Sequence, residues 1–125
     1  MVIRITKRAI LSALQGARES YPREFLCLLD GTVEKEGVLL DAVVIPPLSQ
    51  SSGRSASYVP FFLPATNSGL ASFHSHPSES NEPSKADLHF FSKRLRWHFI
   101  ACVPFDATSV ACYSREGKRI GFEIV

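Results

Sequence analysis

Two histidines, His74 and His76, stand two residues apart at the end of an apolar stretch and are followed at once by Pro77. Strand side chains alternate between the two faces of a sheet, so both histidines would lie on one face of an extended strand. Their ring nitrogens could then converge on one ion, and the carboxylate of Asp87 could supply a third ligand. Three protein ligands with a fourth position left to water are typical of a catalytic zinc site.

Length and composition limit what kind of protein carries this segment. A chain of 125 residues with 45% hydrophobic and 21% charged residues predicts one globular domain over residues 1–125. A net charge of +2 argues against binding to nucleic acid or an anionic membrane. The chain has neither a secretory signal pattern at its start nor an apolar run long enough to cross a membrane, so we expect a cytoplasmic protein.

The chain has three cysteines, Cys27, Cys102 and Cys112, and each lies inside an apolar run. Free cysteine is among the most buried residue types, so we expect three reduced core residues. The sequence leaves open a disulfide between two of them. Since there is no CxxC pair and histidines are available, we do not expect them to bind zinc.

The first third of the chain predicts one helix and two strands. Apolar residues at helical spacing predict an amphipathic helix from Lys7 to about Ser20, with Thr6 as N-cap and Pro22 beyond its end. The run 24–29 predicts a strand buried on both faces and ended by Asp30-Gly31. Residues 38–45 predict its neighbour, reached through the polar turn 34–37 and ended by Pro46-Pro47.

The remainder predicts a mobile Ser- and Gly-rich loop over 48–57, then an edge strand over 58–63 and a strand over 69–76 that carries the histidines. A second helix is expected from Ser84 to about Arg96, with Leu88, Phe91 and Leu95 on one face. Three further strands are expected over 97–105, 110–114 and 119–125, with Glu116-Gly117 as a hairpin turn. This order predicts an α/β fold with a mixed, mostly antiparallel sheet flanked by helices.

Several of these polar residues also have ordinary structural explanations. Ser84 and Asp87 match a capping box, in which each side chain satisfies the backbone amide of the other. His89 and His98 are expected to be satisfied core or surface residues. The basic cluster Lys93, Arg94 and Arg96 is expected to form a solvated helix face, in preference to a nucleic-acid contact.

Taken together, Glu24, then His74-Ser75-His76-Pro77, and then Ser84 and Asp87 at the required spacing resemble the JAMM motif, also called MPN+, of zinc metallo-isopeptidases. The resemblance covers nearly the whole chain, and every motif position is filled, unlike in the metal-free scaffold members of the family. It implies the MPN fold, which is similar to that of cytidine deaminases, and it places the chain with the compact archaeal and bacterial members.

The resemblance also implies a role for each motif residue. His74, His76 and Asp87 would bind Zn²⁺, which lowers the pKa of a bound water to about 7. Glu24 would be the general base, and Ser84 would donate a hydrogen bond to the oxyanion while it also caps its helix. The family removes ubiquitin-like proteins from lysines, which predicts a ubiquitin-like or sulfur-carrier protein and its conjugates as partners, and a homodimer is plausible on the same basis.

The extended tail of such a modifier usually pairs with a strand or loop beside the zinc. Here the loop residues Ser52, Gly53, Arg54 and Ser55 are the candidates for that contact, although a plain solvated connector is an equal alternative.

Three other functions share the same motif or fold. A peptidase could use this site to trim the C-terminus of a sulfur carrier, and the sequence does not separate this activity from isopeptidase activity. A noncatalytic MPN binding module is disfavoured by the complete ligand set and Glu24. A RadC-like protein of DNA metabolism is disfavoured by the near-neutral charge and the absence of a helix-hairpin-helix domain.

Overall fold

The computed structural model describes residues 1–45, 70–91 and 95–125, and the backbone alone of 50–52 and 55–57. Its main feature is a mixed eight-stranded sheet with strand order β10-β1-β3-β2-β6-β7-β8-β9. The strands are β1 (Val2–Ile5), β2 (Leu26–Glu34), β3 (Gly37–Val44), β6 (Ala71–Ser75), β7 (Trp97–Ala101), β8 (Val110–Ser114), β9 (Arg119–Ile120) and β10 (Glu123–Ile124).

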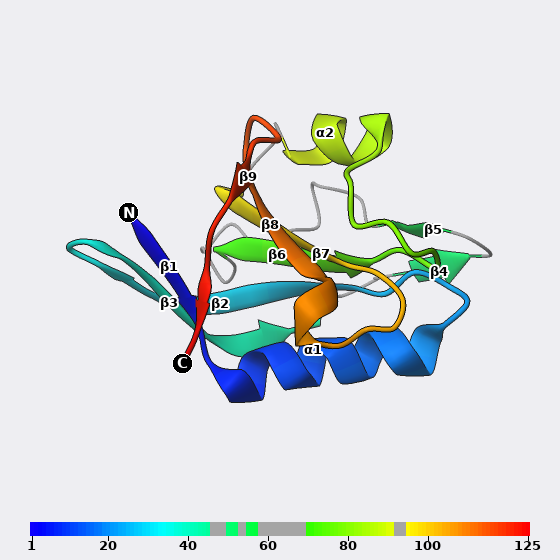
Figure 1. Ribbon diagram of the computed structural model, residues 1–125, viewed down its shortest axis with the longest axis horizontal. Helices are drawn as coiled ribbons and strands as arrows, with labels where there is room; N and C mark the ends of the chain where they lie inside the picture. The colour runs from blue at the N-terminus through cyan, green and yellow to red at the C-terminus, as the bar shows by residue number, and fades with distance from the viewer. Residues whose placement is uncertain (46–49, 53–54, 58–69, 92–94) are drawn as a thin grey trace.

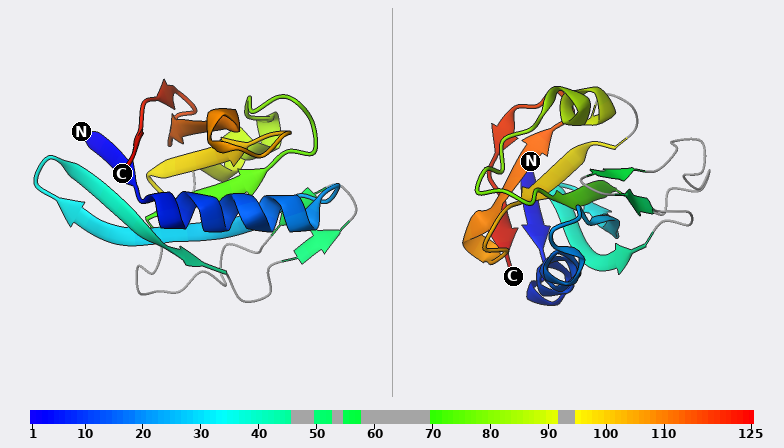
Figure 2. Two further views of the ribbon diagram at one scale, coloured as in Figure 1. Left: turned by 60° about the horizontal axis from the view of Figure 1, so that its bottom comes forward. Right: turned by 90° about the vertical axis from the view of Figure 1, so that its right-hand side faces the viewer.

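Helices α1 (Lys7–Ser20) and α2 (Lys85–Phe91) lie on opposite sides of this sheet, as Figures 1 and 2 show. The pairs β2–β3, β2–β6, β7–β8 and β8–β9 are antiparallel, and the pairs β1–β10, β1–β3 and β6–β7 are parallel. The predicted α/β fold with a mixed, mostly antiparallel sheet flanked by helices is therefore confirmed.

Helix α1 has the predicted bounds. The hydroxyl of Thr6 accepts a hydrogen bond from the backbone amide of Ala9 at 3.1 Å, which is the expected N-cap, and Pro22 lies just beyond the last helical residue. Its apolar stripe faces the sheet and is fully covered. The buried residues are Ala9, Ile10, Ala13, Leu14 and Ala17. They join the larger of the two hydrophobic clusters in the described part of the chain.

Strand β2 crosses the middle of the sheet between β3 and β6, and its first four residues are all buried, as expected. The prediction that Asp30-Gly31 ends the strand was wrong, because the strand continues to Glu34 through a β-bulge at these residues. A β-carbon at Gly31 would lie 1.8 Å from the carbonyl oxygen of Leu39, so the two backbones can approach only because this residue is glycine.

Four other expectations need correction. The strand expected over 97–105 ends at Ala101, and the stretch expected over 119–125 is divided into β9 and β10, which pair with different strands. The residues expected as a loop over 48–57 include a short antiparallel hairpin, β4 (Gln50–Ser52) with β5 (Ser55–Ser57). Helix α2 is described over Lys85–Phe91, and Leu95 and Arg96, expected within it, are not helical; Leu88, expected on its apolar face, is 40% exposed.

Strand β1 was missed at the sequence level, although Ile3 and Ile5 are buried and alternate with Val2 and Arg4. That alternation over four residues is the signal that could have revealed it. The turn at Glu116-Gly117 is confirmed between β8 and β9, where the Gly117 amide donates to the Ser114 carbonyl at 2.9 Å. The edge strand expected over 58–63 lies outside the described residues.

No helix within the described ranges is long and apolar enough to span a membrane.

Candidate metal and active site

His74 lies near the end of β6, which is buried along its whole length, and His76 follows directly after the strand. The backbone amide of His76 donates to the carbonyl of Ala101 on β7 at 2.8 Å, which extends the strand geometry by one residue. The two side chains therefore share one face of the sheet, as the sequence predicted, and their ring centroids are 5.2 Å apart. His74 is 5% exposed, and His76 is partly exposed.

Asp87 reaches this face from the first turn of α2. The backbone amide of Ser84 donates to Oδ2 of Asp87 at 2.8 Å, and the amide of Asp87 donates to the Ser84 hydroxyl oxygen at 3.1 Å. This reciprocal pair is the predicted capping box. It fixes one carboxylate oxygen of Asp87 at the start of the helix and so limits the rotation of the side chain.

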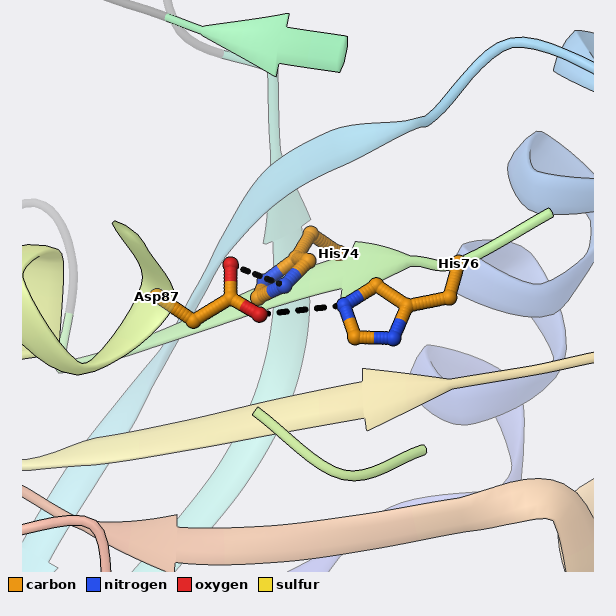
Figure 3. Close-up of side chains that lie close together, drawn as sticks. All are labelled: His74, His76 and Asp87. Carbon is orange, nitrogen blue, oxygen red and sulfur yellow. Dashed lines mark hydrogen bonds and ion pairs between the residues drawn. The ribbon is translucent and has the colours of Figure 1, made fainter. Parts of the chain in front are cut away.

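The three side chains converge on one point, as Figure 3 shows. Nε2 of His74 lies 3.1 Å from Oδ1 of Asp87, and Nε2 of His76 lies 3.1 Å from Oδ2 of the same carboxylate. One ligand atom from each residue falls within 4.8 Å of the others. Two imidazole nitrogens and one carboxylate oxygen suit a zinc ion with a fourth position open.

The hydrogen bonds around the histidines indicate a cation at this point. Nδ1 of His76 lies 3.0 Å from the carbonyl oxygen of Ser80, which can only accept, so Nδ1 carries the proton. In a neutral ring, Nε2 then presents a lone pair to Asp87, and that contact is unfavourable without a second proton or a metal ion. Nε2 of His74 is buried without a hydrogen-bond partner. These three residues therefore fit a divalent metal.

The pKa shifts at the site also favour an ionised Asp87 carboxylate. Burial alone would raise the pKa of Asp87, but the close side-chain contacts with His74 and His76 prevail and hold its pKa well below the usual range. Burial lowers the pKa of His76, yet its contacts with Asp87 and Ser80 and the charge of Glu24 raise the pKa overall. The site therefore holds a carboxylate ready to bind a cation.

Glu24 comes to the same face from the neighbouring strand. Leu26 of β2 is paired with His74, and the amide of Ser75 donates to the carbonyl of Phe25 at 3.0 Å. Continued by one more residue, this antiparallel register places Glu24 beside His76, and opposite residues share a face. The effect of Glu24 on the pKa of His76 agrees with this position.

The backbone that carries Glu24 is held by a residue that the sequence analysis did not single out. The hydroxyl of the buried Ser75 accepts a hydrogen bond from the amide of Phe25 at 2.9 Å. Phe25 also packs edge-on against Phe73 with ring centroids 6.3 Å apart. A serine between the two histidines was visible in the sequence, but only the strand pairing reveals its partner.

Side-chain hydrogen bonds of Tyr113 and Asn81 help to anchor the segment between His76 and α2. The hydroxyl of Tyr113 donates to the carbonyl of Asn81 at 2.8 Å, and the side-chain amide of Asn81 donates to the carbonyl of Ser109 at 3.0 Å. Ser109 belongs to a short 3-10 helix, η2 (Ala107–Ser109). No local pattern in the sequence indicates these contacts, because each joins residues about thirty positions apart.

The cysteines are free and buried, as expected, and lie away from this chemistry. Burial raises the pKa of the Cys27 and Cys112 thiols to about 12 and also raises that of Cys102, which keeps all three protonated and unsuited to bind a metal. His98 is fully buried with two hydrogen-bond partners, and His89 is exposed, so both fit the structural roles expected for them.

The remaining predicted contacts are covered only in part. Ser52 and Ser55 are paired across the β4–β5 hairpin, whereas Gly53 and Arg54 lie outside the described residues. Within the basic cluster, Lys93 and Arg94 are likewise outside, and Arg96 stacks over Trp97 with its guanidinium 5.0 Å from the ring centroid. A role of the hairpin in substrate binding remains a prediction.

Comparison with known proteins places this geometry in a family. The chain is 29% identical over 123 residues to a probable metalloprotease of Haloferax volcanii, a match that covers 94% of this chain and 76% of the relative. It is 27% identical to a JAB1/MPN domain protein from Archaeoglobus fulgidus, with a TM-score of 0.75 and coverage of 98% and 96%.

A structure reported as a JAMM metalloprotease-like zinc site in the proteasome and signalosome gives a TM-score of 0.74 at 28% identity, with coverage of 100% and 99%. The model of the family described as prokaryotic homologues of the JAB domain matches residues 6–115, which include every residue of the site. The chain therefore belongs to the prokaryotic JAB family of JAMM-like metalloproteases.

Proposed function

We propose that this protein is a zinc-dependent isopeptidase that hydrolyses the bond between the C-terminus of a ubiquitin-like modifier and a target lysine. The observation that carries the proposal is the convergence of His74, His76 and Asp87, with Glu24 in register beside them and Ser84 one turn before the aspartate. A metal-free scaffold would not need an ionised carboxylate aimed at two histidine nitrogens.

His74, His76 and Asp87 would hold the zinc ion. When bound, zinc polarises the scissile carbonyl and acidifies a coordinated water. The Ser80 carbonyl fixes the tautomer of His76 so that Nε2 is the ligand atom, and the Ser84 amide fixes Oδ2 of Asp87. The orientation of both ligands is therefore set by backbone groups of this chain.

Glu24 is proposed as the general base. Its carboxylate would take the proton of the attacking water and return it to the lysine amine as that group leaves. It is partly exposed two residues before β2, so substrate can approach it from solvent. The hydrogen bonds between Phe25 and Ser75 hold the backbone on which its position depends.

Ser84 is proposed to donate its hydroxyl to the carbonyl oxygen as negative charge develops there. Its oxygen already accepts from the Asp87 amide at 3.1 Å, which leaves the hydroxyl proton available for the substrate. Capping of the helix and oxyanion stabilisation are therefore compatible, because one uses a lone pair and the other uses the proton.

The direct test is incubation with a lysine-linked ubiquitin-like conjugate, with and without a chelator. Chelator-sensitive release of the modifier is expected, and Ser84→Ala should lower kcat by roughly 10²–10³ with zinc binding retained. If Ser84 only caps the helix, the variant should lose about 1 kcal/mol of stability with kcat almost unchanged.

A linear C-terminal extension of the same modifier serves as a second substrate. Cleavage of the extension without cleavage of the lysine conjugate would contradict the isopeptidase proposal and would support trimming of a sulfur-carrier protein. If shortening residues 49–57 raises KM for the protein conjugate far more than for a short peptide, the hairpin helps to bind the modifier.

A further inference from the structure

His98 is a fully buried histidine on β7, and each of its ring nitrogens has a partner on a different segment. Nε2 lies 3.1 Å from the carbonyl oxygen of Leu95, and Nδ1 lies 2.7 Å from the hydroxyl of Ser72 on β6. The carbonyl can only accept, so Nε2 carries the proton and Nδ1 accepts from Ser72. These two hydrogen bonds fix the plane of the imidazole ring.

The imidazole ring of His98 packs against two aromatic residues of α2. Phe91 lies flat against it, with ring centroids 4.1 Å apart and planes 12° from parallel, and Phe90 meets it edge-on at 5.6 Å. Phe91 is the one fully covered residue of α2 within the described part of the chain. It also lies four residues after Asp87, so the two side chains project from the same face of the helix.

Helix α2 has few other means of staying in place. Its described part covers 7 residues, and a helical segment of this length depends on tertiary packing for stability. Leu88 is 40% exposed, although its side chain also packs against Gly117. The small cluster around Phe91 consists of Ile100, Ala111 and Tyr113, with Phe90 partly buried beside it.

We propose that His98 is a positioning residue for the metal site: it fixes the seat of Phe91 and thereby the rotation of α2 that brings Asp87 to His74 and His76. The inference rests on the proposed metal site but not on the identity of the substrate. Ser72 and His74 lie on the same face of β6, so the hydrogen-bond partner of His98 and a metal ligand share one strand.

A merely space-filling role predicts a different result. If His98 only filled volume, its replacement would lower stability without a separate effect on the metal. If it positions Asp87, loss of the flat ring lowers metal affinity in molecules that remain folded. Partners that orient metal ligands typically change affinity by about 10- to 100-fold when they are removed.

The experiment measures the zinc dissociation constant by competition with a chelator, together with the free energy of unfolding. His98→Ala should weaken zinc binding by roughly 10-fold or more. Phe99→Ala is the matched control, since Phe99 is equally buried on the adjacent position of β7 but belongs to the cluster under α1. It should lose stability with zinc affinity changed less than about 3-fold.

A second variant keeps the test decisive if His98→Ala does not fold. The double substitution Ser72→Ala, His98→Phe retains a flat aromatic ring at position 98 for Phe91 to stack on, and it removes both partners of the Ser72–His98 hydrogen bond. It should restore zinc affinity to within about 3-fold of the wild type. Unchanged affinity in folded His98→Ala, or equal losses in His98→Ala and Phe99→Ala, would overturn the proposal.

Zinc binding is measured without substrate, so the two proposals fail separately. A protein that binds zinc and responds to His98→Ala as expected, but cleaves no conjugate, would contradict the isopeptidase function and leave the positioning role intact.

Discussion

The two helices of this protein differ in how much of each is used to hold it on the sheet. Helix α1 buries five of its 14 residues, whereas α2 buries one of the 7 that the structure describes. The larger helix supplies none of the residues proposed to act on the metal or substrate, and the smaller one supplies Asp87. The difference indicates that stability and metal chemistry depend on opposite faces of one sheet.

Each helix is linked to the proposed site through one aromatic residue that packs against the sheet or its helix. On the α1 side, Phe25 packs against Gly16, where a β-carbon would lie 2.4 Å from the phenyl ring. On the α2 side, Phe91 rests on His98. The proposed base thus depends on α1 and the third metal ligand on α2, so substitutions on each side should affect different steps.

The largest expected effect comes from the proposed base. Glu24→Gln should retain zinc and the fold but lower turnover by at least about 100-fold, because glutamine cannot accept the proton of water. Zinc content and steady-state kinetics on one preparation check this. Turnover close to that of the wild type would mean that another group is the base. The α1 side of the sheet would then have no proposed role in catalysis.

Lowering the pH should reduce the free energy of unfolding, because His98 beneath α2 becomes protonated more readily in the unfolded chain. Burial, with smaller effects from His74 and Arg115, lowers the pKa of His98 to about 4 from its ordinary value of 6.5. Protons therefore bind more readily to the unfolded chain, and the contribution of His98 to stability is present above pH 6.5 and is lost as the pH falls toward 4.

The free energy of unfolding is expected to fall by about 2 kcal/mol between about pH 7.5 and about pH 5. Denaturant unfolding in the presence of chelator measures it, and the double substitution Ser72→Ala, His98→Phe is the control. The control should show a flatter dependence on pH over this range. The same slope in both proteins would mean that another group titrates.

On the α1 side, Gly16→Ala should displace Phe25 and with it the backbone that carries Glu24. We expect kcat to fall roughly 10-fold, since small misplacements of a catalytic group are costly, while the zinc dissociation constant stays unchanged. Ser12→Ala, at an exposed position one turn earlier on α1, is the matched control and should leave both values unchanged. A loss of zinc in Gly16→Ala would show that the two sides are not independent.

The smallest effect is expected at Tyr113, whose hydroxyl holds the segment before α2 through Asn81. Tyr113→Phe removes one hydrogen bond and should cost about 1 kcal/mol of stability. We also expect a few-fold weaker zinc affinity, because the loop that carries the capping box is less well held. Calorimetry measures the stability and chelator competition measures the zinc affinity. A loss of zinc affinity as large as that of His98→Ala would contradict the expectation that Tyr113 matters less than His98.

The site could be found from the sequence more completely than the supports that hold it. Strand periodicity was enough to place His74 and His76 on one face, and the short spacing to Asp87, together with the resemblance to the JAMM motif, identified the third ligand. The capping of α1 by Thr6 and the capping box of α2 were also correctly predicted, because each involves residues three apart.

The errors came from effects that local patterns do not contain. Gly31 was interpreted as a strand end because glycine usually marks turns, yet here it permits a bulge against Leu39. The apolar face assigned to α2 ignored that the sheet covers only its Phe91 end. His98 was recognised as structural, but its partner Ser72 depends on the pairing of β6 with β7, which the sequence does not specify.

The central claim is that His74, His76 and Asp87 bind one zinc ion, and elemental analysis after extensive dialysis tests it most directly. The wild type should retain close to one zinc per chain, and His74→Ala should lose most of it. The double substitution His74→Ala, His76→Ala should retain none, and chelation should lower the thermal stability of the wild type alone. Full zinc retention in the double variant would contradict the account.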